Sequence, residues 1–437
     1  MAPFASKSLG IIHAPFLRKF FPYDPGMGLF QVIAILLTLT ALFSYVNERY
    51  LHLHTTIGVM LIALLMSVAL IVLGDFGLGI EPFARRLLGQ VEFDKALLQW
   101  MLGFLLFAGS LHVELGELHR QRGLIALLAT VGTVLSMMLV GGLTFAALRV
   151  VGLAMPMLYC LLFGALISPT DPVAVLAMMK GAGAPKSIQT KLAGESLFND
   201  GIGVVLFMML LGLATGTGHA GVASVTWLLL REVIGGAVIG FAAGALVYRL
   251  LKRVDNSQVE VLLTLALAMG GYALAQSLHV SAPIAAVVSG IFIGNTARSS
   301  AMSVRTREHL DLFWDLIDEI LNAVLFMLIG LVVLTFHFGG RHLMAVLLVI
   351  PIVLFARWCS IAGAVKVLSR QRPFRRGIIP ILTWGGLRGG LSVAMALSIP
   401  DNAWRNTIIA ITYGVVIFSI AIQGTTIKGV VRHYLKT

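Results

Sequence analysis

The chain has 437 residues, of which 58% are hydrophobic and only 12% are charged, and its formal net charge is +12. Soluble globular proteins carry about 25% charged residues, so the composition excludes an ordinary soluble domain and predicts an all-α polytopic membrane protein. We attribute the positive charge to basic residues in the loops, which orient a membrane protein, and a nucleic-acid partner is not expected.

Apolar runs predict the spans, because about 20 apolar residues cross a bilayer as a helix. Before the first run, residues 1–27 form an N-terminal segment in which no cleavable signal peptide is apparent. After the last run, residues 431–437 are predicted to form a short cytoplasmic tail. About thirteen candidate spans lie between them, near 28–46, 55–73, 96–113, 123–148, 155–179, 192–213, 226–249, 260–278, 282–296, 315–336, 343–366, 377–398 and 404–427.

Two of these runs are interrupted, 155–179 by prolines and 377–398 by glycines. The interruptions lie about 220 residues and seven spans apart, so the two halves of the chain would have inverted orientations. Paired interrupted helices at corresponding positions of two halves point to the binding site of a transporter.

Lys and Arg are distributed unevenly between the loops on the two sides. With thirteen spans, 20 of them fall on one side and 9 on the other. The positive-inside rule then predicts a multi-pass protein of the cell (inner) membrane, with its N-terminus outside and its C-terminus cytoplasmic. The bias is absent before residue 100, so the placement of the first two spans stays open.

The first interruption reads Ser168-Pro-Thr-Asp-Pro172. Each proline removes a backbone donor and leaves nearby carbonyls without intrahelical partners. Free carbonyls, the Thr170 hydroxyl and the Asp171 carboxylate suit a small cation. The motif alone is equally compatible with a kinked structural helix in which Asp171 caps the following half-helix.

The next span contains Glu195-Ser-Leu-Phe-Asn-Asp200. Ser196 and Asp200 are four residues apart and share one helix face, with Glu195 and Asn199 on the neighbouring face. A carboxylate at membrane depth costs about 2.5–3.5 kcal/mol on insertion scales, so these acids are expected to have a function. A purely structural pair between Asp200 and an arginine is the alternative.

Arg388 is the intramembrane cation of the second interruption, Trp384-Gly-Gly-Leu-Arg-Gly-Gly390. We expect a structural ion pair between Arg388 and Glu195, which leaves Asp171 and Asp200 for a transported ion. Arg357 lies in the middle of another span and is expected to pair with an acid at the head of the tenth span, Asp315, Asp318 or Glu319. Asn322 either supports the core or approaches the ion.

These motifs resemble those of the monovalent cation/proton antiporters, in particular the electroneutral NhaP-type branch. The resemblance is carried by Thr170-Asp171-Pro172, Glu195-Ser-Leu-Phe-Asn199-Asp200-Gly201 and Gly386-Leu-Arg388-Gly389-Gly390, with weaker likeness at 285–290 and 326–331. It implies thirteen helices, inverted six-helix repeats, two crossed broken helices and a homodimer. Core helices would lie at about 123–213 and 343–427, and dimer or scaffold helices at about 28–113 and 226–336.

The resemblance also implies roles for individual residues. Asp171 and Asp200 would bind the cation or the proton, with help from Ser196 and from the Thr170 backbone. Glu195, Asn199 and Arg388 would support them. Some relatives carry a further acid in the third span, but residues 106–110 contain none.

The expected function is antiport of a monovalent cation, Na⁺ and otherwise Li⁺ or K⁺, for H⁺ by alternating access. A buried carboxylate is neutralised by either a proton or a cation, and the neutral amide of Asn199 adds no second titrating charge, so exchange is predicted to be one for one. A cation channel and an organic-anion symporter that uses Arg388 are the alternatives. No cofactor, resident metal, organic substrate or enzymatic activity is expected, and membrane lipid is the expected surrounding. Ion preference, pH optimum and regulation are left open.

Overall fold

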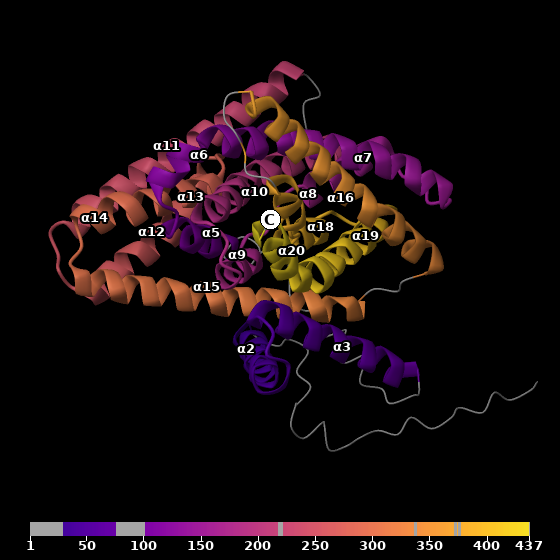
Figure 1. The fold of residues 1–437 in the computed structure, drawn as a ribbon, viewed down its shortest axis with the longest axis horizontal. Helices are drawn as coiled ribbons and strands as arrows, with labels where there is room; N and C mark the ends of the chain where they lie inside the picture. The colour runs from indigo at the N-terminus through magenta and orange to yellow at the C-terminus, as the bar shows by residue number, and fades with distance from the viewer. Residues whose placement is uncertain are drawn as a thin grey trace, which may run out of the picture. The chain divides into compact units, whose positions relative to one another are not determined.

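The computed structural model describes residues 29–75, 101–216, 222–335, 339–370, 374 and 377–436, and these residues form helices and no strands (Figure 1). They belong to two compact units. The first comprises residues 1–92 and 326–337, and the second comprises residues 93–325 and 338–437. The predicted N-terminal segment 1–27 lies outside the described residues.

The described part of the first unit contains α2 (Leu29–Val46), η1 (Asn47–Leu51), α3 (Thr55–Asp75), the end of α15 and η5 (Val333–Thr335). His52 adopts a left-handed backbone (φ 52°) at the turn between η1 and α3. Ser67 on α3 donates to the carbonyl oxygen of Gly330 at 2.9 Å. A Cβ on Gly330 would lie 2.5 Å from that of Ala63, so the glycine permits this close helix contact.

The second unit carries the motifs singled out above. Its helices are α5 (Leu102–Leu111), α6 (Leu115–Leu127), η3 (Leu128–Gly132), α7 (Thr133–Val150), α8 (Met157–Ile167), α9 (Val173–Gly181), α10 (Lys186–Ala214), α11 (Val222–Leu251), α12 (Ser257–Ser277), α13 (Ala282–Phe292), η4 (Ile293–Ala297), α14 (Arg298–Ser300), most of α15 (Val304–Val332), α16 (Gly340–Leu368), α17 (Ile378–Trp384), α18 (Gly390–Leu397), α19 (Arg405–Phe418), η6 (Ser419–Gly424) and α20 (Thr425–Lys436).

Seven helices among the described residues are long and apolar enough to cross a membrane: Thr55–Leu73, Leu115–Val150, Lys186–Ala214, Leu230–Leu251, Ser257–Ser277, Gly340–Leu368 and Arg405–Leu435. Three shorter apolar helices are Leu102–Leu111, Met157–Ile167 and Ala282–Ala297. The all-helical membrane fold is therefore confirmed. The thirteen crossings and their orientation stay predictions.

Both predicted interruptions are real breaks. Residues 168–172 separate α8 from α9, where Pro169 and Pro172 cannot donate helical hydrogen bonds, and residues 385–389 separate α17 from α18. The two breaks touch, because the Asp171 N–H donates to the carbonyl oxygen of Leu387 at 2.8 Å. The two broken helices therefore meet through their backbones.

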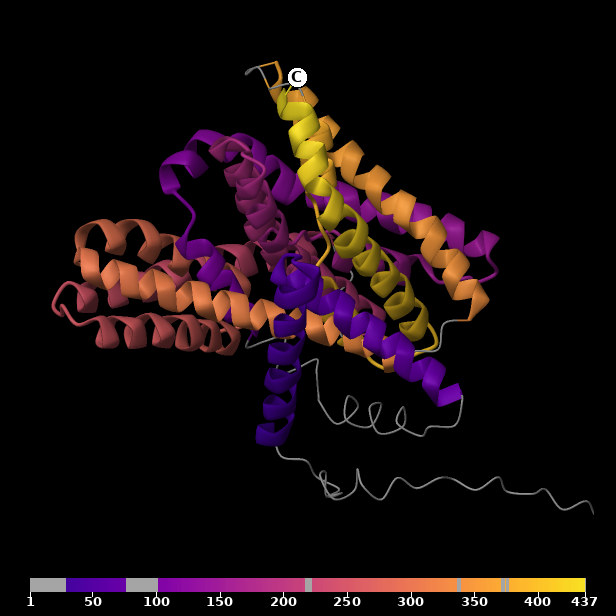
Figure 2. The ribbon, with the colours of Figure 1, turned by 60° about the horizontal axis from the view of Figure 1, so that its bottom comes forward.

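Small residues let the neighbouring helices come close to the breaks. A Cβ on Gly164 of α8 would lie 2.3 Å from the Met137 carbonyl oxygen of α7, and one on Gly203 of α10 would lie 2.2 Å from Pro169. Figure 2 shows α16 (orange) and α19 (yellow) running side by side, and these two helices are in direct contact. The breaks are thus held between α7, α10, α16 and α19.

Candidate functional site

Three polar side chains join the first break to α10. The hydroxyls of Thr170 and Ser196 lie 2.8 Å apart. The Asn199 amide nitrogen donates to Thr170 Oγ1 at 3.0 Å, and Asn199 Oδ1 accepts from the Thr170 N–H at 3.3 Å. All three residues are buried. Asn199 therefore supplies a partner to backbone that the prolines have freed from the helix.

Asp171 and Asp200 come together beside these hydrogen bonds. Asp200 is buried and Asp171 is half-buried, and the Asp200 carboxylate lies in electrostatic range of both Asp171 and Arg388. A Cβ on Gly389 would lie 2.1 Å from Asp171 Oδ2, so only glycine leaves room there for the carboxylate. The predicted site residues Thr170, Asp171, Ser196 and Asp200 are thus drawn from one break and one helix.

Arg388 belongs to the second break, and its side chain stabilises the first break. Its Nη1 donates to the carbonyl oxygen of Ser168 and, at 2.9 Å, to that of Pro169. In a continuous helix the N–H of residue 172 would serve the Ser168 carbonyl, but Pro172 has no N–H. The guanidinium therefore replaces the missing donor. The backbone N–H of Arg388 donates to Ser419 Oγ at 2.9 Å.

The expected pair between Glu195 and Arg388 is wrong. Glu195 instead binds Arg357 of α16 in a bidentate pair, in which Nη1 contacts Oε1 and Nη2 donates to Oε2 at 2.9 Å. Both side chains are buried. The reason is that the orphan carbonyls of the first break engage Arg388, whereas Arg357 presents its planar fork to the carboxylate. The expectation that Arg357 pairs with Asp315, Asp318 or Glu319 is wrong as well.

Each broken helix thus has an arginine at the carbonyl end of its first half. Arg388 contacts the carbonyls at the end of α8, and Arg357 Nη2 donates to the Leu382 carbonyl oxygen of α17 at 3.3 Å. Cations are favourable at this negative end of the helix dipole. The place of Arg357 inside an apolar run marks it as an intramembrane cation in the sequence, but its supporting role beside Glu195 and α17 was missed.

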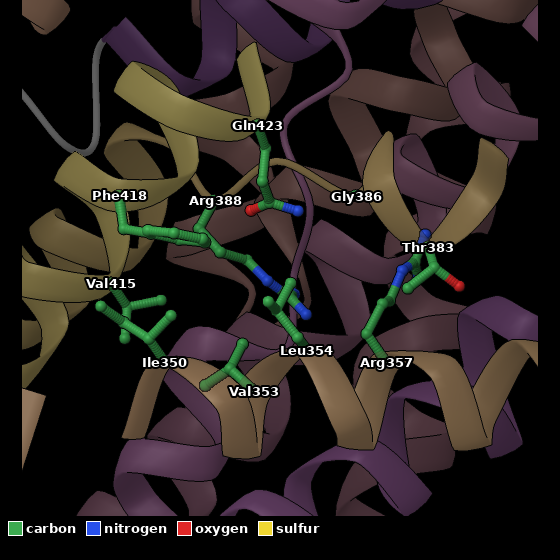
Figure 3. Close-up of a pocket in the computed structure, with 10 residues that line it drawn as sticks. All are labelled: Ile350, Val353, Leu354, Arg357, Thr383, Gly386, Arg388, Val415, Phe418 and Gln423. Atoms are coloured by element: carbon green, nitrogen blue, oxygen red, sulfur yellow. The ribbon is translucent and has the colours of Figure 1, made fainter. Parts of the chain in front are cut away.

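The two arginines also line a hollow beside the second break. Figure 3 shows Arg388 entering it from the break and Arg357 from α16, among apolar side chains of α16 and α19. Gln423 lies at its edge and donates to the Trp384 carbonyl oxygen at 3.3 Å. The charged lining of this hollow is cationic, so the prediction of a cation site rests on the two aspartates instead.

The residues around the crossing carry more negative than positive charge. The carboxylates are Asp171, Glu195 and Asp200, and the guanidinium groups are Arg357 and Arg388. With all five ionised, one negative charge is left over. Within the described residues, no cluster of three His, Cys, Asp or Glu side chains is placed to hold a metal ion. The groups at the crossing that suit a small cation are carboxylate, hydroxyl and carbonyl oxygens.

The chain is similar to known proteins over most of its length. The family model described as "Sodium/hydrogen exchanger, transmembrane" matches residues 37–433. The chain belongs to the sodium/hydrogen exchanger family. The membership confirms the resemblance inferred from the three motifs, and it makes the chain a multi-pass membrane protein of a cation/proton antiporter family.

Several sodium/hydrogen exchanger relatives align over most of the chain. The Na⁺/H⁺ antiporter NhaP of Pseudomonas aeruginosa is 47% identical over 92% of this chain and 96% of its own. The Na⁺/H⁺ antiporter NhaH of Halobacillus dabanensis is 35% identical over 84% and 91%. The sodium proton antiporter MjNhaP1 of Methanocaldococcus jannaschii has the same fold, with a TM-score of 0.72, 19% identity, and coverage of 94% of this chain and 100% of that one.

Proposed function

We propose that this protein exchanges Na⁺ for H⁺ at Asp171 and Asp200. The observation that carries the proposal is that Asp171 and Asp200 meet at the crossing of the two broken helices, where three carboxylates face two guanidinium groups. A buried carboxylate without a counter-charge is costly. One bound proton or one bound cation removes that cost, and the two cannot do so together. Further support comes from the antiporter names of the aligned relatives.

In this mechanism Asp200 is the main titrating group. When it is ionised, oxygens of Asp200, Asp171, Ser196 and Thr170 surround the cation. Thr170 and Ser196 already share a hydrogen bond, so their hydroxyl oxygens are held together at the break. Asn199 keeps the break attached to α10, while Arg388 supplies its missing donor. Glu195 is neutralised by Arg357 and takes no part in ion binding.

Exchange follows because the site has the same net charge in each of its two loaded states. The protonated site and the cation-loaded site have the same net charge, whereas the empty ionised site carries one more negative charge. Moving that empty site through a low-dielectric barrier is unfavourable. Alternating access is therefore restricted to the two loaded states, and one Na⁺ crosses for each H⁺. We further propose a homodimer in the inner membrane with the C-terminus in the cytoplasm.

A series of cations tests the function. Purified protein is reconstituted in proteoliposomes that contain a fluorescent pH dye, and Na⁺, Li⁺, K⁺ or choline is added outside. We expect Na⁺ and Li⁺ to drive a pH change that saturates with concentration, and choline to drive none. Exchange with K⁺ alone would identify a K⁺/H⁺ antiporter instead. Unitary currents without saturable counterflow would indicate a channel and contradict the proposal.

A further inference from the structure

The start of α12 carries two carboxylates that the proposed mechanism does not use. Asn256 caps this helix, because its side chain accepts from the N–H groups of Gln258 and Val259. Asp255 therefore stands one residue before the cap, and Glu260 stands four residues after it. Side chains at these two positions meet across the first turn of a helix, and the charges of Asp255 and Glu260 interact. The cap thus brings the two carboxylates together.

Two hydrogen bonds fix how the first half of α12 lies against α15. Thr306 Oγ1 donates to Asp255 Oδ1 at 3.4 Å, and Trp314 Nε1 donates to Thr264 Oγ1 at 3.1 Å. Glu260 precedes Thr264 by four residues, so the two share one face of α12. Glu260 therefore lies between these two contacts and is turned toward α15.

Glu260 is a fully buried acid, and neither of its carboxylate oxygens has a hydrogen-bond partner among the described residues. Arg307, which follows Thr306 in the chain, donates from Nε to the Met302 carbonyl oxygen at 3.2 Å. Buried charges in proteins are paired or coordinate metals. Because Asp255 is exposed beside Glu260, an ion from the water at this end of the helices can supply the counter-charge.

We propose that Glu260 and Asp255 bind a divalent cation at the junction of α12 and α15. Two carboxylates match the charge of such an ion. The hydroxyls of Thr306 and Ser303, which lie 3.0 Å apart, add neutral oxygens next to Asp255. One or two carboxylates with bound water suit Mg²⁺, and a larger number of protein oxygens suits Ca²⁺. The ion ties the start of α12 to the start of α15, and it uses no residue of the proposed exchange site.

The test follows thermal unfolding of the purified full-length protein in detergent. MgCl₂ or CaCl₂ is added, and choline chloride keeps the ionic strength constant. We expect at least one of the two ions to raise the unfolding temperature of the wild type in a saturable way, because an ion that binds only the folded state stabilises it. Glu260→Gln keeps the shape of the side chain but removes its charge, so the apparent Kd for the ion should rise about tenfold or more.

Glu308→Gln is the matched control, since Glu308 is exposed near the start of α15 and its replacement removes the same charge. It should respond to the ion like the wild type. Asp255→Asn takes the place of Glu260→Gln if the latter is not monodisperse in detergent. The inference is overturned if neither ion raises the unfolding temperature of the wild type, or if the neutral variant and the wild type respond equally. Neither outcome bears on the proposed exchange of Na⁺ for H⁺.

Discussion

Replacement of Asp200 by asparagine is expected to abolish exchange and to leave the protein folded in the membrane. The amide has nearly the shape of the carboxylate, but it neither releases a proton nor carries the negative charge that a cation needs. The excess charge at the crossing disappears with it. Proteoliposomes that contain Asp200→Asn should show background pH change on addition of Na⁺, and background uptake of radioactive Na⁺.

Asp401→Asn is the matched control, because Asp401 is an exposed aspartate that pairs with Arg405, four residues on. It should exchange like the wild type. In detergent, Asp200→Asn should unfold at the same temperature as the wild type and Asp401→Asn. The substitution removes a buried charge and leaves no other buried charge without a partner. Normal Na⁺-driven pH change by Asp200→Asn would show that Asp200 is not the titrating group.

Replacement of Arg357 by methionine is expected to destabilise the fold strongly. It leaves the Glu195 carboxylate buried without its bidentate partner, and loss of one member of a buried ion pair typically costs about 3–5 kcal/mol. The carbonyl end of α17 loses a cation at the same time. The expected result is a large fall in the temperature of thermal unfolding in detergent.

The double variant Glu195→Gln with Arg357→Met should recover much of this loss, because neither charge is then buried alone. Lys186→Met provides the comparison for an exposed pair, the one with Glu114, and such pairs contribute at most about 1 kcal/mol. If Arg357→Met unfolds at the wild-type temperature, or if the double variant is no more stable than Arg357→Met, the pairing of Glu195 with Arg357 has no energetic importance.

Much of the fold follows from local chemistry. Long apolar runs predict the helices, and the described residues form helices at those positions. Pro169 and Pro172 predict one break because proline cannot donate to a helix, and the glycines at 385–390 predict the other. The grouping of Ser196, Asn199 and Asp200 follows from helical spacing alone. These features could be predicted because each depends on residues within one or two helical turns.

The partners of the two arginines could not be predicted in the same way. Glu195 and Arg357 are 162 positions apart in the sequence, and the sequence pattern favours Arg388 as the partner of this carboxylate. The two arginines differ because the carbonyl groups of the first break that lack helical donors accept from Arg388. This contact forms only when the second break packs against the first. The role of Arg357 therefore emerges from tertiary packing.

In the proposed mechanism one cation replaces one proton at a shared site, so that a full cycle moves no net charge. The most direct test is the rate of Na⁺/H⁺ exchange in proteoliposomes whose membrane potential is clamped by K⁺ and valinomycin, first at zero and then strongly negative inside. We expect the same rate at both potentials, with one Na⁺ taken up for each H⁺ released. A rate that follows the potential, or more than one H⁺ for each Na⁺, would contradict it.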